Sequence, residues 1–157
     1  MVTGHGERDA PRLALANSFG ADLAVDAAVD DPVAALQKAT GRLADIVVDV
    51  TAKAPGALAQ AIALARPGGK IVIAGTRGSL DVPGFIPDLI VYKELHIMGA
   101  LGVDARAYRK ALEILASGRW PFADLPRSVA SLDTVEELLQ TMAGERGVPP
   151  VHAVLVP

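Results

Sequence analysis

The chain contains 157 residues, of which 51% are hydrophobic and only 4% aromatic, and it carries a formal net charge of -3 at pH 7. Because the charges are mixed and form no basic stripe, neither a nucleic acid nor a membrane surface is indicated as a partner. No apolar run reaches the roughly 18 residues of a membrane-spanning helix. The absence of cysteine excludes disulfides and thiolate metal sites, so the reducing cytoplasm is the expected compartment. A core of Ala, Val, Leu and Ile favours an α/β fold.

The first 43 residues predict an alternation of short strands and helices. Residues 1–3 resemble the end of a strand, and a polar loop with two glycines follows them. Asp9 is expected to cap the next helix and Gly20 to stop it, because an aspartate accepts from free amides and glycine permits a positive φ. A short strand at residues 21–25 and a helix from Asp31-Pro32 to Gly41 complete this part.

Residues 44–75 carry the clearest pattern in the chain. The run at residues 45–50 is nearly continuously apolar and β-branched, which predicts a strand buried on both faces. A helix with apolar spacing follows Pro55, and residues 66–69 end it before a second buried strand at residues 70–75. Strand, helix and strand of this length form a βαβ unit of a parallel sheet. Ligands of such sheets bind beyond the carboxyl ends of the strands, here at Thr51-Ala52 and Gly75-Thr76.

The second half predicts a long loop followed by further helices and strands. The loop at residues 76–85 is expected to face a ligand as a lid. A short helix at residues 87–93 and a strand from Leu95 to Leu101 follow, and then an amphipathic helix between Asp104 and Gly118. Residues 119–131 contain two prolines and are expected to be mostly irregular. The last elements are a helix after Asp133 and a closing strand at residues 151–156.

Four stretches in this order resemble the medium-chain, zinc-type alcohol dehydrogenase family. They are LALANSFGAD from Leu13, ADIVVDVTA from Ala44, LARPGGKIVIAGTRG from Leu64 and LHIMGALGV from Leu95. The terminal PVHAVLVP is similar to the strand that returns to the family's catalytic domain. The resemblance implies an α/β, Rossmann-like doubly wound parallel sheet. It further implies a partial nucleotide-binding domain at residues 1–118 and a segment at residues 119–157 that returns toward the catalytic domain.

The same resemblance implies parts that lie outside these residues. The family's first strand and its G-x-G-x-x-G turn are expected before Met1, and the zinc ligands and proton relay in a preceding catalytic domain. We therefore expect no catalytic or metal-binding residues in this chain, which is similar to an oxidoreductase family but is expected to be inactive alone. Because the missing strand is central in the order 3-2-1-4-5-6, residues 1–3 are expected to close onto residues 45–50, or another chain to fill the gap.

The resemblance implies NAD or NADP as the cofactor, with contacts at the carboxyl ends of the strands. Without the phosphate-binding turn, affinity is expected to be about millimolar at best. The residues after the strand at 45–50 are expected to face the adenosine and ribose side, the next loop the nicotinamide ribose, and the last strand end the carboxamide. These contacts are, in chain order, Thr51 and Ala52, then Gly75, Thr76 and Arg77, then Ala100, Leu101 and Gly102.

Two further contacts follow from the resemblance. The tip of the first strand, at Gly4 and His5, is expected to select the adenine ribose, and small residues with Arg8 nearby favour NADP slightly over NAD. His152 matches a position at which relatives carry a basic residue near the pyrophosphate. His5, His96 and His152 show no metal-ligand spacing, so no metal is expected in this chain although the intact family carries zinc.

Two other functions remain open on the sequence. An S-adenosylmethionine-dependent methyltransferase uses a similar sheet and a similar L-x-P-G-G strand entry, and a non-catalytic oligomerisation module needs neither cofactor loop nor catalytic domain. The family's edge strand, from Leu95 to Leu101 here, pairs with its two-fold mate, which implies a homodimer. Tyr92, His96 and Met98 would then lie at or near the contact.

Overall fold

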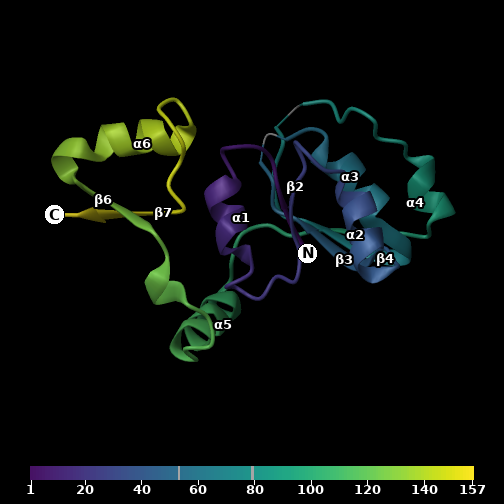
Figure 1. The fold of residues 1–157 in the computed structure, drawn as a ribbon, viewed down its shortest axis with the longest axis horizontal. Coiled ribbons are helices and arrows are strands. Elements are labelled where there is room, and N and C mark those ends of the chain that lie inside the picture. Colours follow the sequence, from purple (N-terminus) through teal and green to yellow (C-terminus); the bar gives the residue numbers. More distant parts are fainter. Residues whose placement is uncertain (53, 79) are drawn as a thin grey trace. The chain divides into compact units, whose positions relative to one another are not determined.

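The computed structural model describes residues 1–52, 54–78 and 80–157, so Ser79 of the expected ligand-facing loop lies outside the described residues. The chain forms two compact units, one made of Met1–Asp30 with Ala105–Pro157 and the other of Asp31–Asp104. Figure 1 labels their helices and most of their strands. Every pairing between described strands is parallel, which confirms the incomplete Rossmann-like α/β class.

The unit Asp31–Asp104 is built on a three-stranded sheet in the order β3-β4-β5. Its strands are β3 (Ala44–Asp49), β4 (Ala65–Ile73) and β5 (His96–Gly99). Helix α3 (Ala57–Leu64) connects the first two strands and packs on one face, where Ala61, Ile62 and Ile71 are fully enclosed. The predicted βαβ unit is therefore present, although β4 begins earlier than expected, because Ala65 already pairs with Ala44 before an irregularity in register.

Two helices complete this unit. Helix α2 (Pro32–Thr40) begins and ends as expected, since the Asp31 carboxylate accepts from the Val33 amide at 2.9 Å and Gly41 adopts the left-handed conformation. Helix α4 (Asp88–Tyr92) is the predicted short helix, and it lies next to the core cluster under α3. Beyond its end, the Lys93 ammonium donates to the carbonyl of Ile62 at 2.6 Å and thereby supports the last turn of α3.

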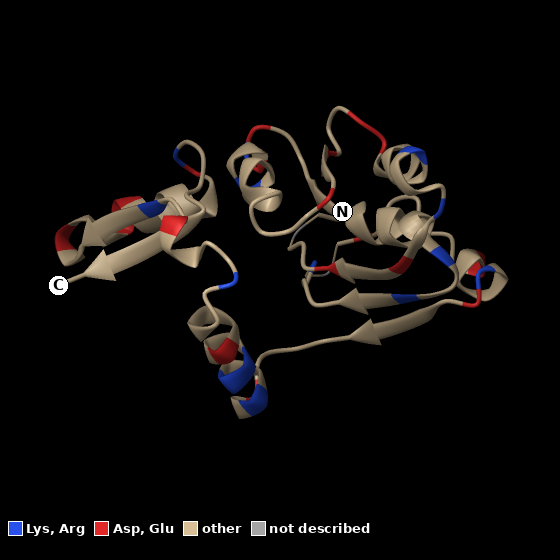
Figure 2. Cartoon of the chain, turned by 60° about the horizontal axis from the view of Figure 1, so that its bottom comes forward, with Lys and Arg blue, Asp and Glu red and all other residues tan. Residues whose placement is uncertain are grey.

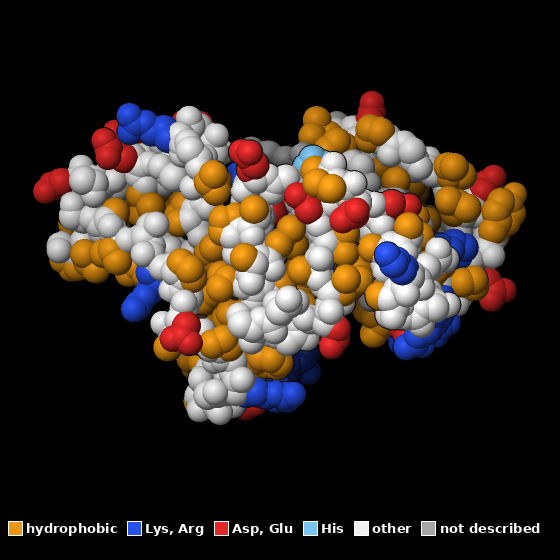
Figure 3. Space-filling view, in the orientation of Figure 1, with side chains coloured by type: hydrophobic (Ala, Val, Ile, Leu, Met, Phe, Trp, Pro, Cys, Tyr) orange, Lys and Arg blue, Asp and Glu red, His pale blue; other side chains and the backbone are white. Residues whose placement is uncertain are grey.

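The opposite face of the three-stranded sheet is exposed, which corrects the expectation that β3 is buried on both faces. Ile46 and Val48 are 61% and 60% exposed. The strand register places Val72 beside Val48 and Met98 beside Val72, so this row of the exposed face is apolar across all three strands, whereas the row of Ile46 continues through Lys70 and His96. Helices α3 and α4 pack on the other face alone. Figure 3 shows hydrophobic side chains at many places on the visible surface of the molecule.

The other unit begins with a small parallel sheet of β1 (Val2–Gly4) and β2 (Ala24–Asp26), joined by α1 (Ala10–Ala16). Asp9 occupies the N-cap position as predicted, but its carboxylate accepts from the His5 amide at 2.9 Å rather than from the helix. Gly20 ends the turn that follows α1 with φ +86° and lies against the Trp120 ring, which leaves no room for a side chain there.

The rest of this unit contains α5 (Ala105–Ala116), β6 (Arg127–Ser131), α6 (Val135–Ala143) and β7 (His152–Val156). Two short 3-10 turns, η1 (Phe122–Asp124) and η2 (Leu132–Thr134), flank β6. Helices α5 and α6 and the closing strand were predicted, whereas β6 corrects the expectation that residues 119–131 are mostly irregular. β6 forms because it pairs with β7 along its whole length, a contact between distant segments.

The expected closure of residues 1–3 onto residues 45–50 is wrong, because β1 pairs with β2 while β3 pairs with β4. The strands β1 and β3 lie in different sheets. The alternative, that another chain supplies the strand between them, stays a prediction. Among the described residues, no helix combines the length and apolarity that a bilayer span requires.

Candidate functional site

The carboxyl end of β3 is organised by Asp49. Its carboxylate side chain is only 4% exposed. One carboxylate oxygen accepts from the amide of Thr51 at 3.0 Å and from its hydroxyl, and the other accepts from the Arg77 guanidinium. The Asp49 carbonyl accepts from the amide of Ala74 at 2.8 Å. Asp49 thus joins the loop after β3 to the loop after β4.

Arg77 is the other half of this connection. Its side chain is 9% exposed, and besides the ion pair it donates from Nε to the carbonyl of Ala54 at 3.3 Å. A further guanidinium nitrogen lies 3.4 Å from the carbonyl of Gly75. A planar guanidinium with several fixed donors suits such a task better than a lysine. Because these donors are used inside the protein, Arg77 holds the loops rather than presenting its charge to solvent.

Gly75 brings the two loops into contact. A Cβ atom at this position would lie 2.0 Å from the carbonyl oxygen of Thr51, so only glycine fits. Thr51, Ala52 and Thr76 around it are exposed. The edge therefore exposes backbone groups and small side chains at Thr51-Ala52 and Gly75-Thr76, whose contact with a ligand stays a prediction.

The end of β5 adds a third strand end to the same edge. The amide of Ala100 donates to the carbonyl of Ile73 at 2.9 Å, which places it beside the end of β4. Leu101 is 94% exposed, and Gly102 has φ +69°, a conformation in which glycine is favoured. The structure therefore brings together three of the expected contact segments within the unit Asp31–Asp104.

The tip of β1 carries Gly4 and His5 in the other unit. The loop there is held by Asp26, whose carboxylate accepts from the amides of Gly6 at 2.8 Å and Ala28 at 2.9 Å. These hydrogen bonds, first that of Gly6 and then that of Ala28, lower the pKa of Asp26. Our reading of the sequence missed Asp26, although an aspartate at the carboxyl end of a short strand was a usable signal.

Arg8 and His152 lie at other places in the same unit. The Arg8 guanidinium reaches Gly144 at the end of α6, where an added Cβ would lie 3.0 Å from it. His152 is the first residue of β7, is exposed and stands opposite Arg127. The cofactor contacts expected of Arg8 and His152 stay predictions.

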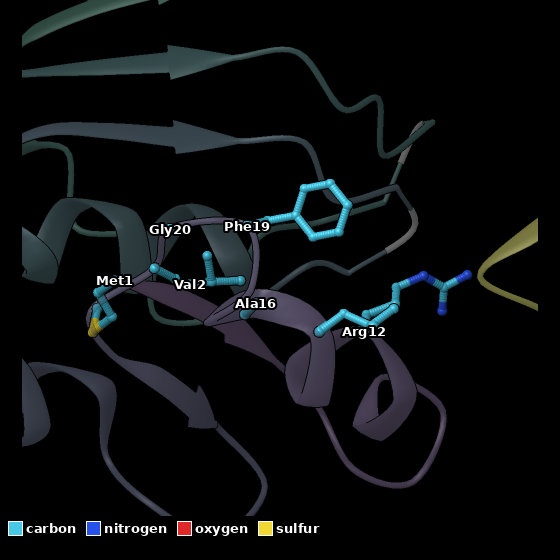
Figure 4. A pocket seen from close by; sticks show the side chains of 8 residues that line it. Met1, Val2, Arg12, Ala16, Phe19 and Gly20 are labelled. Atoms are coloured by element: carbon cyan, nitrogen blue, oxygen red, sulfur yellow. The ribbon is translucent and has the colours of Figure 1, made fainter. Parts of the chain in front are cut away.

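An open pocket of about 380 Å³ lies between α1 and the start of β1. Figure 4 shows Val2, Ala16 and Phe19 among its lining residues, with Arg12 at its rim. Arg12 also donates to the carbonyl of Pro150 at 3.2 Å. None of the expected cofactor contacts lines this pocket.

Two remaining features of the molecule are the distribution of its basic residues and the grouping of possible metal ligands. Figure 2 shows Lys and Arg on several separate elements rather than in one stripe, in agreement with the sequence. Within the described part of the chain, no three His, Cys, Asp or Glu side chains are grouped so that they could hold a metal. We assign no step to zinc here, and the absence of zinc ligands from this chain stays a prediction.

Comparison with known proteins decides the family. The model of the zinc-binding dehydrogenase family matches residues 2–117. The chain belongs to this family. It is 69% identical, over its whole length, to a probable alcohol dehydrogenase of Mycobacterium tuberculosis H37Rv, of which it covers 43%. An alcohol dehydrogenase of Rhizobium meliloti is 34% identical over 69% of the chain, which covers 31% of that relative.

Solved structures of family members share the fold. Benzyl alcohol dehydrogenase of Acinetobacter calcoaceticus superposes with a TM-score of 0.77 at 19% identity, over 98% of this chain and 41% of that one. An NAD-dependent alcohol dehydrogenase gives 0.78 at 24% identity, over 99% and 43%. The chain thus spans less than half of the length of the relatives it matches. The family match gives no support to the methyltransferase or to the oligomerisation module.

Proposed function

We propose that this chain supplies the nicotinamide dinucleotide-binding part of an alcohol dehydrogenase-like oxidoreductase. The observation that carries the proposal is the joined edge of Thr51, Gly75 and Ala100, because three parallel strands end there with exposed backbone and small side chains. The family supplies the ligand class, and a relative's structure from Escherichia coli was solved with NADH. Because the chain covers only 43% of the relative from Mycobacterium tuberculosis, alcohol oxidation is proposed for the whole protein.

Within this proposal the strand ends divide the cofactor between them. Thr51 and Ala52 face the adenosine and ribose side, Gly75 and Thr76 the nicotinamide ribose, and the segment Ala100, Leu101 and Gly102 the carboxamide. Gly4 and His5 select the adenine ribose, and His152 lies near the pyrophosphate. We place the limit of the nucleotide-binding part at Gly118 and the protein in the cytoplasm.

The proposed cofactor is NADP in slight preference to NAD. The tip of β1 is formed by Gly4 and His5, and the nearby Asp26 already accepts two amide hydrogen bonds. A carboxylate engaged in this way is less available to a ribose 2′-hydroxyl, the interaction that selects NAD. Titration with NADH and with NADPH tests the preference, and tighter binding of NADH would contradict it.

A thermal-shift titration with NADPH, NADH and S-adenosylmethionine tests the function itself. A ligand that binds only the folded chain raises its melting temperature by mass action. We expect both dinucleotides to raise it at millimolar concentration and S-adenosylmethionine to leave it unchanged. Stabilisation by S-adenosylmethionine alone, or by none of the three, would overturn the proposal.

We also propose that the chain forms a homodimer through the outer edge of β5. This strand lies at the end of the order β3-β4-β5, so its outer backbone groups are available for pairing. Tyr92 is 76% exposed close to this edge, and Met98 is about half exposed on the strand itself. A two-fold pairing of identical edges would cover these groups in one contact.

A further inference from the structure

Resting on the dinucleotide site proposed above, we propose that the Asp49–Arg77 ion pair is its positioning device. It holds the loop after β4 against the loop after β3, so that the backbone of Gly75 and Thr76 is presented to the nicotinamide half of the cofactor. Neither side chain needs to touch the cofactor, since both are almost fully enclosed. They are positioning residues rather than catalytic ones.

The bonds of the pair are directed at the loops. Asp49 binds the amide and hydroxyl of Thr51 with one oxygen and Arg77 with the other. Arg77 in turn reaches the carbonyl of Ala54 in the loop after β3, at 3.3 Å, and lies 3.4 Å from that of Gly75 in its own loop. The core of this unit, around Ile62 and Ile71, is entirely apolar and takes no part in these bonds.

A buried ion pair is a costly way to stabilise a fold. Removing two charges from water costs several kcal/mol each, and well-packed apolar residues often serve stability as well or better. The same strand shows the inexpensive alternative at its other end, where Asp45 pairs with Arg66 at 2.6 Å with both side chains more than 40% exposed. Of these two pairs, only Asp49–Arg77, at the proposed ligand-binding end, is buried. We take this as support for a role in the geometry of that end.

The test uses the full 157-residue chain, labelled with ¹⁵N and titrated with NADH while the amide shifts are followed. The variants are Asp49→Asn and Arg77→Gln, each of which removes one charge and keeps a polar side chain. Arg77→Lys keeps the charge but cannot reach all the acceptors. Asp45→Asn and Arg66→Gln are the matched controls. They break an ion pair between β3 and β4 that lies at the opposite end of these strands from the proposed site.

In the wild type we expect saturable NADH shifts at Gly75 and Thr76 and at Gly4 and His5. In Asp49→Asn and Arg77→Gln the shifts at Gly75 and Thr76 should be lost while those at Gly4 and His5 persist. The cofactor would then be held by its adenine half alone. Arg77→Lys should recover part of the loss, and both controls should behave as the wild type. A loss of fold alone would not separate the two halves of the cofactor in this way.

The other outcomes are equally decisive. If the wild type shows no saturable shift, the proposed function fails and this inference with it. If the wild type responds and the variants keep the full response at Gly75 and Thr76, only the positioning role is overturned. Should the single variants not fold, the double variant Asp49→Asn/Arg77→Gln, which leaves no unpaired charge, replaces them in the same titration. Failure of the double variant to fold would also overturn the inference, because the pair would then be needed for the fold itself.

Discussion

At the scale of single residues, close approaches and buried bonds decide which side chains can be changed. Gly75 lies where the backbones of two loops meet, and Asp26 and Asp49 each hold a loop through their carboxylates. None of these residues is large or apolar, so their contribution to stability does not come from burial of apolar surface. It comes from geometry that a different side chain cannot reproduce.

Gly75→Ala should destabilise the unit strongly. The added methyl group would lie 2.0 Å from the Thr51 carbonyl oxygen, so the backbone of one loop must move. We expect a loss of about 1–3 kcal/mol in the free energy of unfolding, measured by urea denaturation. Gly99→Ala is the control, because an added Cβ there meets nothing within 4 Å. Equal stability of the two variants would contradict the close approach of the loops.

The Asp26 carboxylate should make part of the stability depend on acid pH. Its pKa is lowered from the ordinary value of 3.8, chiefly by the amide of Gly6 and then by that of Ala28. A carboxyl whose folded pKa is depressed contributes stability above its unfolded pKa and loses that contribution as the pH falls through the folded pKa. The unfolding free energies of wild type and Asp26→Asn should therefore differ at neutral pH and converge in strong acid. A difference that is constant with pH would refute the assignment.

At the scale of elements, the sheet of the unit Asp31–Asp104 is covered on one face only. Parallel sheets are usually covered on both faces by their crossover helices. Here α3 and α4 pack on one face, while Ile46, Val48 and Met98 stay exposed on the other. Helix α5 shows the same feature, because Tyr108, Leu112 and Leu115 of its apolar side are exposed. Apolar faces of this kind mark surfaces that a further element or partner covers.

The two faces of the sheet should respond differently to the same substitution. Ile71→Ala removes a fully buried side chain and should cost about 2–5 kcal/mol of unfolding free energy. Ile46→Ala, at a position 61% exposed, should cost about 0.5 kcal/mol or less. Chemical denaturation of both variants at low protein concentration provides the measurement. A large cost at Ile46 would show that its face is covered in solution.

At the scale of the whole molecule, the arrangement of strands leaves several backbone edges without a partner among the described residues. The sheet β1-β2 and the sheet β3-β4-β5 each end in a strand whose outer side pairs with no described strand. Such edges invite association with another strand. The proposed dimer uses the edge of β5, which lies at the far side of its sheet from β3.

Self-association should therefore depend on β5. Sedimentation velocity at high micromolar concentration should show a dimer for the wild type. Met98→Lys should shift it toward monomer, because charged side chains on an edge strand oppose pairing. Leu112→Lys on α5 adds the same charge at a leucine that is also exposed, and it should leave the dimer intact. Dissociation by the control instead of by Met98→Lys would move the interface to α5.

Local patterns predicted most of the helices and strands correctly from the sequence. The caps of α2 lie at Asp31 and Gly41, where the sequence places them, because capping depends on residues within one turn. The strands β3 and β4 follow from runs of β-branched residues, and the four family stretches identify the fold class. The segments at Thr51, Gly75 and Ala100 were predicted as strand ends for the same local reason.

Only the tertiary structure decided which distant groups meet. The ion pair of Asp49 with Arg77 joins residues 28 positions apart, and no spacing in the sequence indicates it. The strand β6 depends on its partner β7, and the Arg8 guanidinium lies beside Gly144, which is far from it in the sequence. The exposure of Ile46 likewise depends on which elements pack on the sheet. Local propensity acts over a few residues, whereas pairing and burial are properties of the assembled chain, and so the sequence determined the elements and the family while the structure determined their contacts.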